Sequence, residues 1–470
     1  MTQHTRLAGL AARSCAWSER WFPDAFAFAV LAVLIVAAAA LLHGAPVTIV
    51  AKSFGEGFWS LIPFTMQMSF IVIGGYVAAD SPPIARLTQA LASVPRSGRA
   101  AVTMVAVFSM LLSLLHWGLS LVLSSLLVRA LARRNDLSMD YRAAGAAAYL
   151  GAGSVWAMGL SSSAAQLQAN PASMPPTLLA ITGVIPFQET IFLWQSLVLT
   201  LVLMLVSAVI AWYSTPQDAQ ACTAAQLQIS LEQPRYELPP RTRPGEWLEY
   251  NPLLNLLIVL LGLGWLAGEF AAKGVVTALS SLNTYNFVFL MLGLLLQWRP
   301  RNFLEAVARS VPSVAGVLIQ FPFYGGVAAI LTSAVNAENA SLTAVLSHAF
   351  TQISNTDTFA LVIGLYSAVL GLFIPSAGGK WIVEAPYVMQ TARDLHYHLG
   401  WTVQIYNAAE ALPNLINPFW MLPVLGILKL KARELIGYTF VQFLVHLPLV
   451  LFLLWLLGRT LSYHEPVMPA

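Results

Sequence analysis

The sequence predicts an all-α protein that crosses a lipid bilayer many times. Of its 470 residues, 58% are hydrophobic and only 10% are charged. Apolar runs of about 17 to 25 residues recur between Ala25 and Leu457, and each is long enough to span a bilayer as a helix. The net charge is only +3, and the basic residues are spread over short loops. No nucleic-acid partner is therefore expected, and the lipid bilayer is the expected environment.

Arginine and lysine orient the first spans, because these residues are enriched in cytoplasmic loops. Arginines precede the first apolar run, residues 25–42, which is longer than a typical signal-peptide core and is interpreted as a retained span rather than a cleaved signal. A loop with Lys52 and Glu56 is expected next, and the second span, 57–79, leads to a second group of arginines. Both arginine groups, and the N-terminus, are expected in the cytoplasm.

Residues 101–132 are predicted to form a re-entrant hairpin. They are mostly apolar, they are interrupted near the middle by His116, Trp117 and Gly118, and arginines flank both ends. A single crossing would place one arginine group outside, whereas a hairpin that enters the membrane and returns keeps both inside. The distribution of positive charge therefore favours the hairpin.

The chain is predicted to contain two repeats of opposite orientation. The first repeat comprises residues 1–213. It is followed by a polar cytoplasmic linker at 214–250, a connecting span at 251–281, and the second repeat at 282–470. A second interrupted apolar segment, 358–392, holds the position in the second repeat that the first hairpin holds in the first repeat. The lysine and arginine positions agree with this inversion, so an inverted-topology repeat is expected.

About nine transmembrane helices and two re-entrant helical hairpins follow from this pattern, with the N-terminus inside and the C-terminus outside. Besides the first two spans, the predicted crossings are 143–166, 191–213, 252–267, 282–297, 311–333, 406–428 and 435–457. Short hydrophobic segments resemble one another easily, but the charge distribution supports the inversion independently.

The predicted site is centred on the tip of the second hairpin. Proline removes a backbone donor, and each glycine weakens a helix by about 1 kcal/mol relative to alanine, so the chain should unwind there. Unwound backbone at membrane depth is tolerated only inside protein or beside a water-filled cavity, as in secondary transporters. Amides and a helix N-terminus there suit a carboxylate, for which the expected ligands are Pro375, Ser376, Gly378, Gly379 and Lys380.

The same residues also have alternative interpretations as purely structural residues. The glycines also suit a kink for close helix packing, and a lysine can extend its ammonium to the membrane interface. At the first hairpin tip, His116 beside Trp117 and Gly118 is expected to donate to a substrate or to titrate near neutral pH. A buried packing role is the alternative for this histidine.

Interrupted helices in both repeats are expected to complete a substrate site near the bilayer midplane. In the first repeat, Gly159, Ser161 and Ser163 offer hydroxyls and carbonyls, although serine hydroxyls also bond back to their own helix. In the second repeat, Asn414 and Asn417 lie among prolines that interrupt the helix. Such paired breaks are typical of transporters.

Two acidic residues, Glu384 and Glu410, lie in predicted membrane segments near Lys380. They are expected either to carry coupling protons or to form salt bridges with Lys380. Neither cysteine has metal-type spacing around it, and no cofactor is expected beyond a coupling ion, H⁺ or Na⁺.

An intramembrane enzyme and an anion channel are the rival interpretations. The sequence has no H-E-x-x-H, no P-loop and no G-x-S-x-G motif, which argues against an enzyme. Repeats with discontinuous helices favour alternating access over a continuous pore. The residues therefore predict a secondary active transporter for a small organic carboxylate.

Short motifs along nearly the whole chain narrow this prediction. They are Trp21-Phe22-Pro23-Asp24, Gly57-Phe58-Trp59, Met66-Gln67-Met68, Trp117-Gly118, Ala148-Tyr149, Gly159-x-Ser161-x-Ser163, Gln320-Phe321-Pro322-Phe323-Tyr324, Pro375-Ser376 with Gly378-Gly379, and Pro418-Phe419-Trp420. Because these motifs occur in this order and at this spacing, the chain resembles the bacterial short-chain fatty acid transporter family, the acetoacetate and butyrate uptake type. The resemblance implies a multi-pass carrier of short-chain monocarboxylates in the bacterial cytoplasmic (inner) membrane.

The same resemblance places the chain in a larger ion-transporter grouping that includes sodium-coupled dicarboxylate carriers and aminobenzoyl-glutamate transporters. Those relatives use inverted repeats with two re-entrant hairpins and often form dimers, so a homodimer is expected and other organic anions are the alternative substrates. The chain departs from the family pattern at His116, where asparagine is usual, at Lys380, where histidine is usual, and at 407–412, where a Gly-Glu-Gln-Trp run is usual. The extra cations at the tips bear on the substrate and the coupling ion.

Overall fold

The computed structural model of the protein describes residues 25–171, 174–216, 220–231, 240–373, 377–417 and 419–468. These residues form helices with no strand among them, as the sequence predicted. Seven of the described helical segments are long and apolar enough to cross a membrane, and shorter apolar helices accompany them. The motif at Trp21 to Asp24 and the predicted ligands Pro375 and Ser376 lie outside the described residues.

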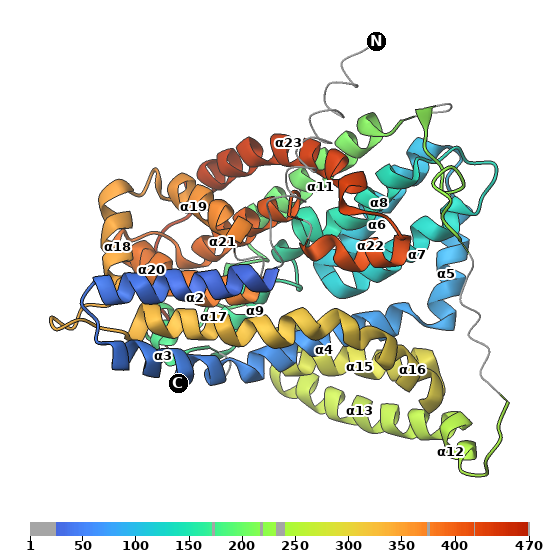
Figure 1. Cartoon of the computed structure of the whole chain (residues 1–470), viewed down its shortest axis with the longest axis horizontal. Helices are drawn as coiled ribbons and strands as arrows, with labels where there is room; N and C mark the ends of the chain where they lie inside the picture. The colour runs from blue at the N-terminus through green and yellow to red at the C-terminus, as the bar shows by residue number, and fades with distance from the viewer. Residues whose placement is uncertain are drawn as a thin grey trace.

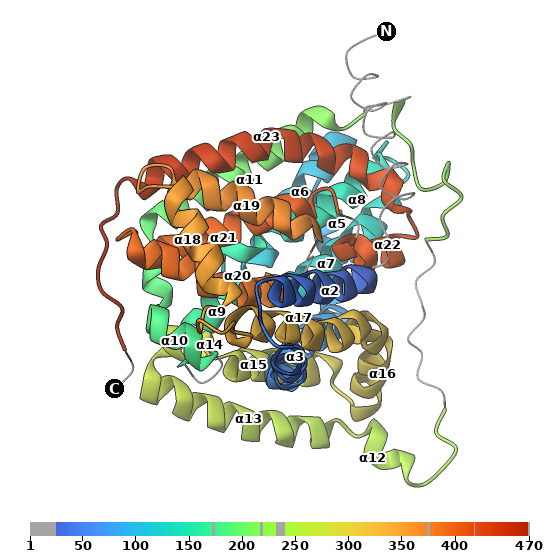
Figure 2. The same ribbon diagram turned by 60° about the vertical axis from the view of Figure 1, so that its left-hand side comes forward.

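One group of helices occupies the lower part of Figures 1 and 2. Helix α17 packs against α2 and α3, and α15 packs against α4 and α13. The bounds are α2 (Ala25–Leu42), α3 (Val47–Ser60), α4 (Ile62–Ala79), α13 (Pro252–Lys273), α14 (Val275–Ser280), α15 (Leu282–Gln297), α16 (Pro300–Ser310) and α17 (Ala315–Ser333).

A second group lies above the first in both views. Helix α6 packs on α7, α8 and α11, while α23 packs on α11, α19 and α21. The bounds are α6 (Gly98–Leu115), α7 (Trp117–Ala132), α8 (Tyr141–Leu150), α11 (Trp194–Ser214), α19 (Phe359–Phe373), α20 (Ala377–Asp394), α21 (Leu399–Asn414), α22 (Leu422–Leu428) and α23 (Ala432–Gly458).

The two groups meet where α7 contacts α4 and where α20 contacts α17. Helix α18 contacts α20, and α5 contacts α7. The remaining shorter helices are α5 (Pro82–Ala92), α9 (Ser163–Gln168), α10 (Pro176–Thr182), α12 (Glu246–Tyr250) and α18 (Leu342–Ile353). The two predicted hairpins thus bring the groups together.

Two predicted spans coincide with helices, since α2 and α15 have the expected bounds. The loop expected around Lys52 and Glu56 is wrong, because both residues lie on α3 as an (i, i+4) pair with Nζ and Oε1 3.8 Å apart. The helix is interrupted at Leu61, between α3 and α4, and Pro63 sits in the first turn of α4, where its missing N–H costs no hydrogen bond.

Both interrupted apolar segments turn back on themselves. At the open end of α6–α7, the Arg134 Nη1 donates to the carbonyls of Ala92 at 2.9 Å and Pro95 at 2.8 Å, which precede α6. At the open end of α19–α20, the rings of Phe359 and Tyr397 lie 4.7 Å apart. The antiparallel hairpins are therefore present, and their re-entry into a membrane remains a prediction.

Helix breaks are present near both of the predicted positions. After α8 the chain forms a π-helical turn (Gly151–Val155) and a 3₁₀ turn (Trp156–Met158) before α9 begins. Near the second predicted break, α21 continues through Pro413 and ends at Asn414. A 3₁₀ turn (Phe419–Met421) then precedes α22.

The predicted topology is testable by cysteine labelling. In a protein whose two cysteines are replaced by serine, Thr356→Cys lies at the open end of the second hairpin and Asn135→Cys at that of the first, and both positions are exposed. A membrane-impermeant maleimide should label position 356 but not position 135 in right-side-out vesicles. Labelling at 135 with protection at 356 would rule out the predicted orientation.

Candidate functional site

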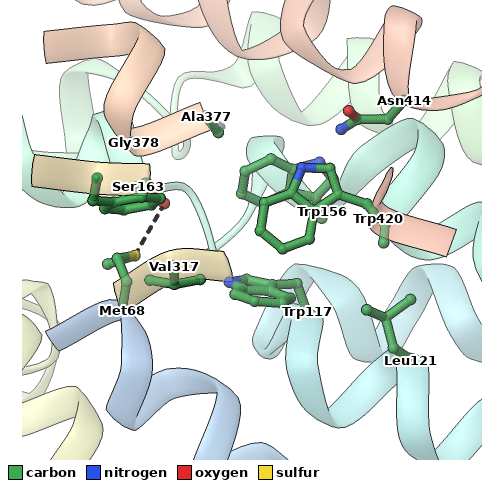
Figure 3. Close-up of a pocket in the computed structure, with 12 residues that line it drawn as sticks. Met68, Trp117, Leu121, Trp156, Ser163, Val317, Ala377, Gly378, Asn414 and Trp420 are labelled. Atoms are coloured by element: carbon green, nitrogen blue, oxygen red, sulfur yellow. Dashed lines mark hydrogen bonds between the residues drawn. The ribbon is translucent and has the colours of Figure 1, made fainter. Parts of the chain in front are cut away.

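A pocket with about 460 Å³ of empty space, including space open to solvent, lies where the two helix groups meet (Figure 3). Each interrupted segment contributes to it. Its lining consists of Met68, Trp117, Leu121, Ala152, Trp156, Ser163, Val317, Phe321, Ala377, Gly378, Asn414 and Trp420. Of the predicted ligands, Trp117, Ser163, Gly378 and Asn414 are thus brought together.

Three tryptophans give the pocket an apolar character: Trp117 at the start of α7, Trp156 in the 3₁₀ turn, and Trp420 before α22. The rings of Trp117 and Trp420 meet edge to face, with centroids 5.4 Å apart and an interplanar angle of 73°. Large aromatic rings bury much apolar surface and hold defined geometries. This side of the pocket suits a short aliphatic chain.

Polar groups gather where α9 and α20 begin. The Ser163 hydroxyl is 3.7 Å from the Met68 Sδ, a weak acceptor, so little is lost when the hydroxyl turns to a substrate (Figure 3). A Cβ added at Gly378 would come within 2.5 Å of the Phe64 ring and 3.5 Å of the Ser163 Cβ. The glycine therefore allows the N-terminal turn of α20, with its amide groups, to border the pocket.

The broken helix holds the first hairpin tip in place. The Trp117 N–H donates to the Ser161 hydroxyl at 2.8 Å. A Cβ at Gly159 would overlap the backbone of Leu114, so glycine is needed for the close approach. Neither Ser161 nor Gly159 lines the pocket, and both position the segment that carries Trp117.

The structure places His116 behind the pocket lining. It is buried, its Nδ1 accepts the Leu119 N–H at 3.1 Å, and this bond caps α7. Its ring packs against Phe289 with centroids 4.1 Å apart and stacks on Tyr285 at 5.6 Å. A Cβ at Gly118 would lie 3.3 Å from this ring. A role of His116 in substrate binding remains a prediction.

The two predicted amides differ in position. Asn414 lines the pocket, its backbone carbonyl accepts from the Tyr149 hydroxyl at 3.0 Å, and its buried side-chain oxygen has no hydrogen-bond partner in the part of the chain that the structure describes. Asn417 is buried, and its Nδ2 donates to the Leu372 carbonyl at 3.4 Å, which ties the helix break to α19. Asn414 is therefore the amide available to a ligand.

Sequence reasoning did not assign several lining residues. Trp156 lies between two glycine-containing breaks, and Trp420 directly follows the break at the end of α21. Met68, Phe321 and Trp420 belong to the motifs that carry the family resemblance, but a motif does not say which way a side chain points. An aromatic residue next to a helix break was the available signal.

Lys380 lies in a separate, fully buried ionic cluster. Its ammonium Nζ is 2.8 Å from Glu410 Oε2 and 3.2 Å from Glu384 Oε2, and all three side chains have 0% exposure. It also donates to the Ser367 hydroxyl at 2.7 Å and to the Ser367 carbonyl at 2.8 Å. The Tyr406 ring centroid lies 4.4 Å from the nitrogen.

This geometry matches the interpretation in which Lys380 pairs with the two glutamates. Lys380 is not among the residues that line the pocket, whereas Gly378, two residues earlier, is. Gly379 between them is buried as part of the first turn of α20. The cluster therefore lies beside the pocket on the same helix, and the predicted contact between Lys380 and a substrate carboxylate stays a prediction.

Comparison with known proteins agrees with the resemblance read from the motifs. The model of the family described as "Short chain fatty acid transporter" matches residues 6–457. A protein of Escherichia coli (strain K12) named for this transport function is 32% identical over 424 residues, covering 89% of this chain and 93% of that protein. A protein of Haemophilus influenzae with the same name is 29% identical over 447 residues, covering 93% and 97%.

Two solved structures share the fold at low sequence identity. MtrF of Neisseria gonorrhoeae, described within a class of antimetabolite efflux pumps, superposes with a TM-score of 0.56 at 16% identity, covering 96% of this chain and 97% of that one. The YdaH transporter of Alcanivorax borkumensis, described as having an unusual topology, gives a TM-score of 0.57 at 17% identity, covering 93% and 98%.

The buried cluster makes a prediction for stability. Lys380→Met leaves two buried carboxylates without their counter-charge, and breaking a buried pair in this way costs about 3–5 kcal/mol. The Tm in detergent should fall, and adding Glu410→Gln should recover part of it. Lys273→Met is the matched control, because Lys273 also pairs with a glutamate at 2.6 Å but its side chain is 53% exposed. Equal melting of both single variants would contradict the prediction.

Proposed function

The chain belongs to the short-chain fatty acid transporter family, and on this premise we propose that it is a secondary active transporter of short-chain monocarboxylates such as butyrate or acetoacetate. It is a multi-pass transporter and not an enzyme. We further propose that it works by alternating access in the bacterial inner membrane, coupled to H⁺ or Na⁺. Its small substrate carries one carboxylate.

The observation that carries this proposal is the pairing of apolar and polar sides in one pocket. The tryptophans offer a surface for an aliphatic chain, and Ser163 with the first turn of α20 offers donors for a carboxylate. The N-terminus of a helix favours an anion by about 0.3–1 kcal/mol, and by up to about 2 kcal/mol where it is partly buried. A short-chain carboxylate has the two ends that this arrangement requires.

The pocket supports a monocarboxylate over a dicarboxylate or an aminobenzoyl-glutamate type of substrate. None of the described residues that line it is a lysine or an arginine, and the basic Lys380 beside it is already paired with two carboxylates. A second substrate carboxylate would therefore enter an apolar pocket without a partner, which is costly. A monocarboxylate needs no partner for a second carboxylate.

Alternating access is supported by the way the pocket is assembled. It is lined by the tips of two hairpins and by two interrupted helices, and broken helices around a central site are the usual parts of such carriers. The proposed orientation, with the N-terminus inside and the C-terminus outside, and a homodimeric assembly are parts of the same proposal.

Uptake into proteoliposomes tests the function directly. Labelled butyrate, acetoacetate and succinate are supplied with pH and sodium gradients imposed one at a time, and protein-free liposomes correct for passive entry of the acids. We expect both monocarboxylates to enter above this background and succinate not to do so. Uptake of succinate alone would favour the dicarboxylate alternative.

A substitution at the start of α20 tests the proposed pocket. Gly378→Leu would push a side chain into Phe64 and Ser163, so butyrate uptake should fall to the level of protein-free liposomes. Gly264→Leu on α13 is the matched control, because nothing lies within 4 Å of a Cβ at that glycine. Both variants should insert into the membrane normally. Wild-type uptake by Gly378→Leu would remove this turn from the site.

A further inference from the structure

The ammonium of Lys380 is surrounded by oxygen atoms from three helices. Ser367 on α19 contributes its hydroxyl and its carbonyl, while α20 contributes Glu384 and α21 contributes Glu410. The nitrogen-to-oxygen distances lie between 2.7 and 3.2 Å. Carboxylate, hydroxyl and carbonyl oxygens are also the ligands that hard metal cations take in proteins. The oxygens around the Lys380 ammonium are therefore of the kinds that surround a bound monovalent cation.

The Lys380 ammonium is enclosed by the surrounding side chains. Lys380 and Glu384 are one turn apart on α20, and their side chains have 0% exposure. The Tyr406 ring lies 4.4 Å from the nitrogen, and a Cβ at Gly371 would come 3.2 Å from Glu410 Oε2. A free ion and this ammonium cannot occupy the same oxygens at once.

The charges of the cluster do not balance. One ammonium faces two carboxylates, so the cluster has a net charge of −1 when both are ionised. A sodium ion in place of the ammonium would leave the same net charge, because it also carries one positive charge. Among the described residues, the other titratable side chains packed around it are the phenols of Tyr324 on α17, Tyr366 on α19, Tyr387 on α20 and Tyr406 on α21, and a phenol is ordinarily neutral near pH 7. An uncompensated buried charge is strongly unfavourable, so one carboxylate must take up a proton.

Hydrogen bonds identify which carboxylate this is. Glu384 Oε2 accepts from the Ser367 hydroxyl at 3.1 Å as well as from Lys380, and these bonds favour its charged form. Neither oxygen of Glu410 accepts a hydrogen bond from the described residues, and Glu410 interacts with Lys380 through an ion contact. Glu410 is therefore the carboxylate that gains and loses the proton.

We propose that the Lys380 ammonium permanently fills a monovalent-cation site and that Glu410 carries one exchangeable proton, so that the carrier is driven by protons and needs no sodium. This inference rests on the proposed function and names its coupling ion. One carboxylate anion and one proton cross together, so no net charge moves. The proton joins Glu410 from the outside and leaves it to the inside.

Helices α20 and α21 connect this proton site to the pocket. Gly378 lines the pocket two residues before Lys380, and Asn414 lines it one helical turn after Glu410. The Tyr406 hydroxyl also donates to the carbonyl of Ala377, another lining residue. A change of charge at Glu410 is therefore transmitted to the walls of the substrate pocket.

The first test asks whether Lys380 fills a cation site, without measuring transport. Lys380→Ala opens the site, so methylammonium chloride should raise the Tm of this variant by several degrees relative to choline chloride, whose cation is too bulky. Wild-type protein and the exposed-pair control Lys273→Ala should show no such difference. If Lys380→Ala does not fold, Lys380→Ala with Glu410→Gln keeps Glu384 and Ser367 as ligands and should respond likewise. Equal Tm values in both salts, for whichever variant is purified, would overturn the inference.

The second test asks which ion drives transport. Acetoacetate uptake by wild-type proteoliposomes should follow an acid-outside pH gradient and ignore a sodium gradient and the membrane potential. Glu410→Gln leaves a neutral Lys380–Glu384 pair, so it should lose the response to pH but retain exchange of internal for external acetoacetate. Glu269→Gln, which changes an exposed pair, should behave as wild type. Sodium-driven uptake by wild type, or pH-driven uptake by Glu410→Gln, would refute the inference.

The two tests separate the inference from the function on which it rests. If wild-type protein transports a monocarboxylate with sodium, the proposed function stands and the proton assignment fails. If it transports no monocarboxylate under any gradient, the proposed function fails, and the Tm measurements still decide whether Lys380 fills a cation site.

Discussion

Polar groups within apolar helices must find their partners inside the protein, because the surrounding lipid offers none. Hydrogen bonds tie two of the described helix breaks to other segments of the chain. The Trp117 N–H donates to Ser161 at the first hairpin tip, and the Tyr149 hydroxyl donates to the Asn414 carbonyl at the end of α21. The breaks therefore gather at one place, and the pocket lies among them.

The same constraint acts more strongly on charge. Lys380 has no exposure, so its ammonium requires acceptors in the adjacent helices. Ser367 and Glu384 accept its hydrogen bonds and Glu410 adds an ion contact, which ties α19, α20 and α21 together. None of the described residues that line the pocket is basic, so in the proposed function an anion is recognised there by amides and a hydroxyl.

The local pattern of the sequence predicted many of the helices and their breaks, although it missed α3 around Lys52 and Glu56, and it did not predict the long-range contacts. Apolar length gave α2 and α15 their bounds, and proline or glycine marked the breaks. Spacing also placed Glu384 one turn after Lys380, whereas Glu410 lies thirty residues away and meets them only through the packing of α21 on α20. Trp156 entered the pocket for a similar reason, because the direction of a side chain within a π-helical or 3₁₀ turn does not follow helical periodicity.

Tyr406 shows how the ionic cluster and the pocket depend on one another. Its ring faces the Lys380 ammonium, and its hydroxyl donates to the Ala377 carbonyl at the start of α20. The same side chain therefore contacts both the ammonium and the first turn of α20. That turn borders the pocket and carries the amides that we propose for the substrate carboxylate. In the proposed mechanism, Tyr406 is the buried side chain through which protonation of Glu410 alters the binding of an anion.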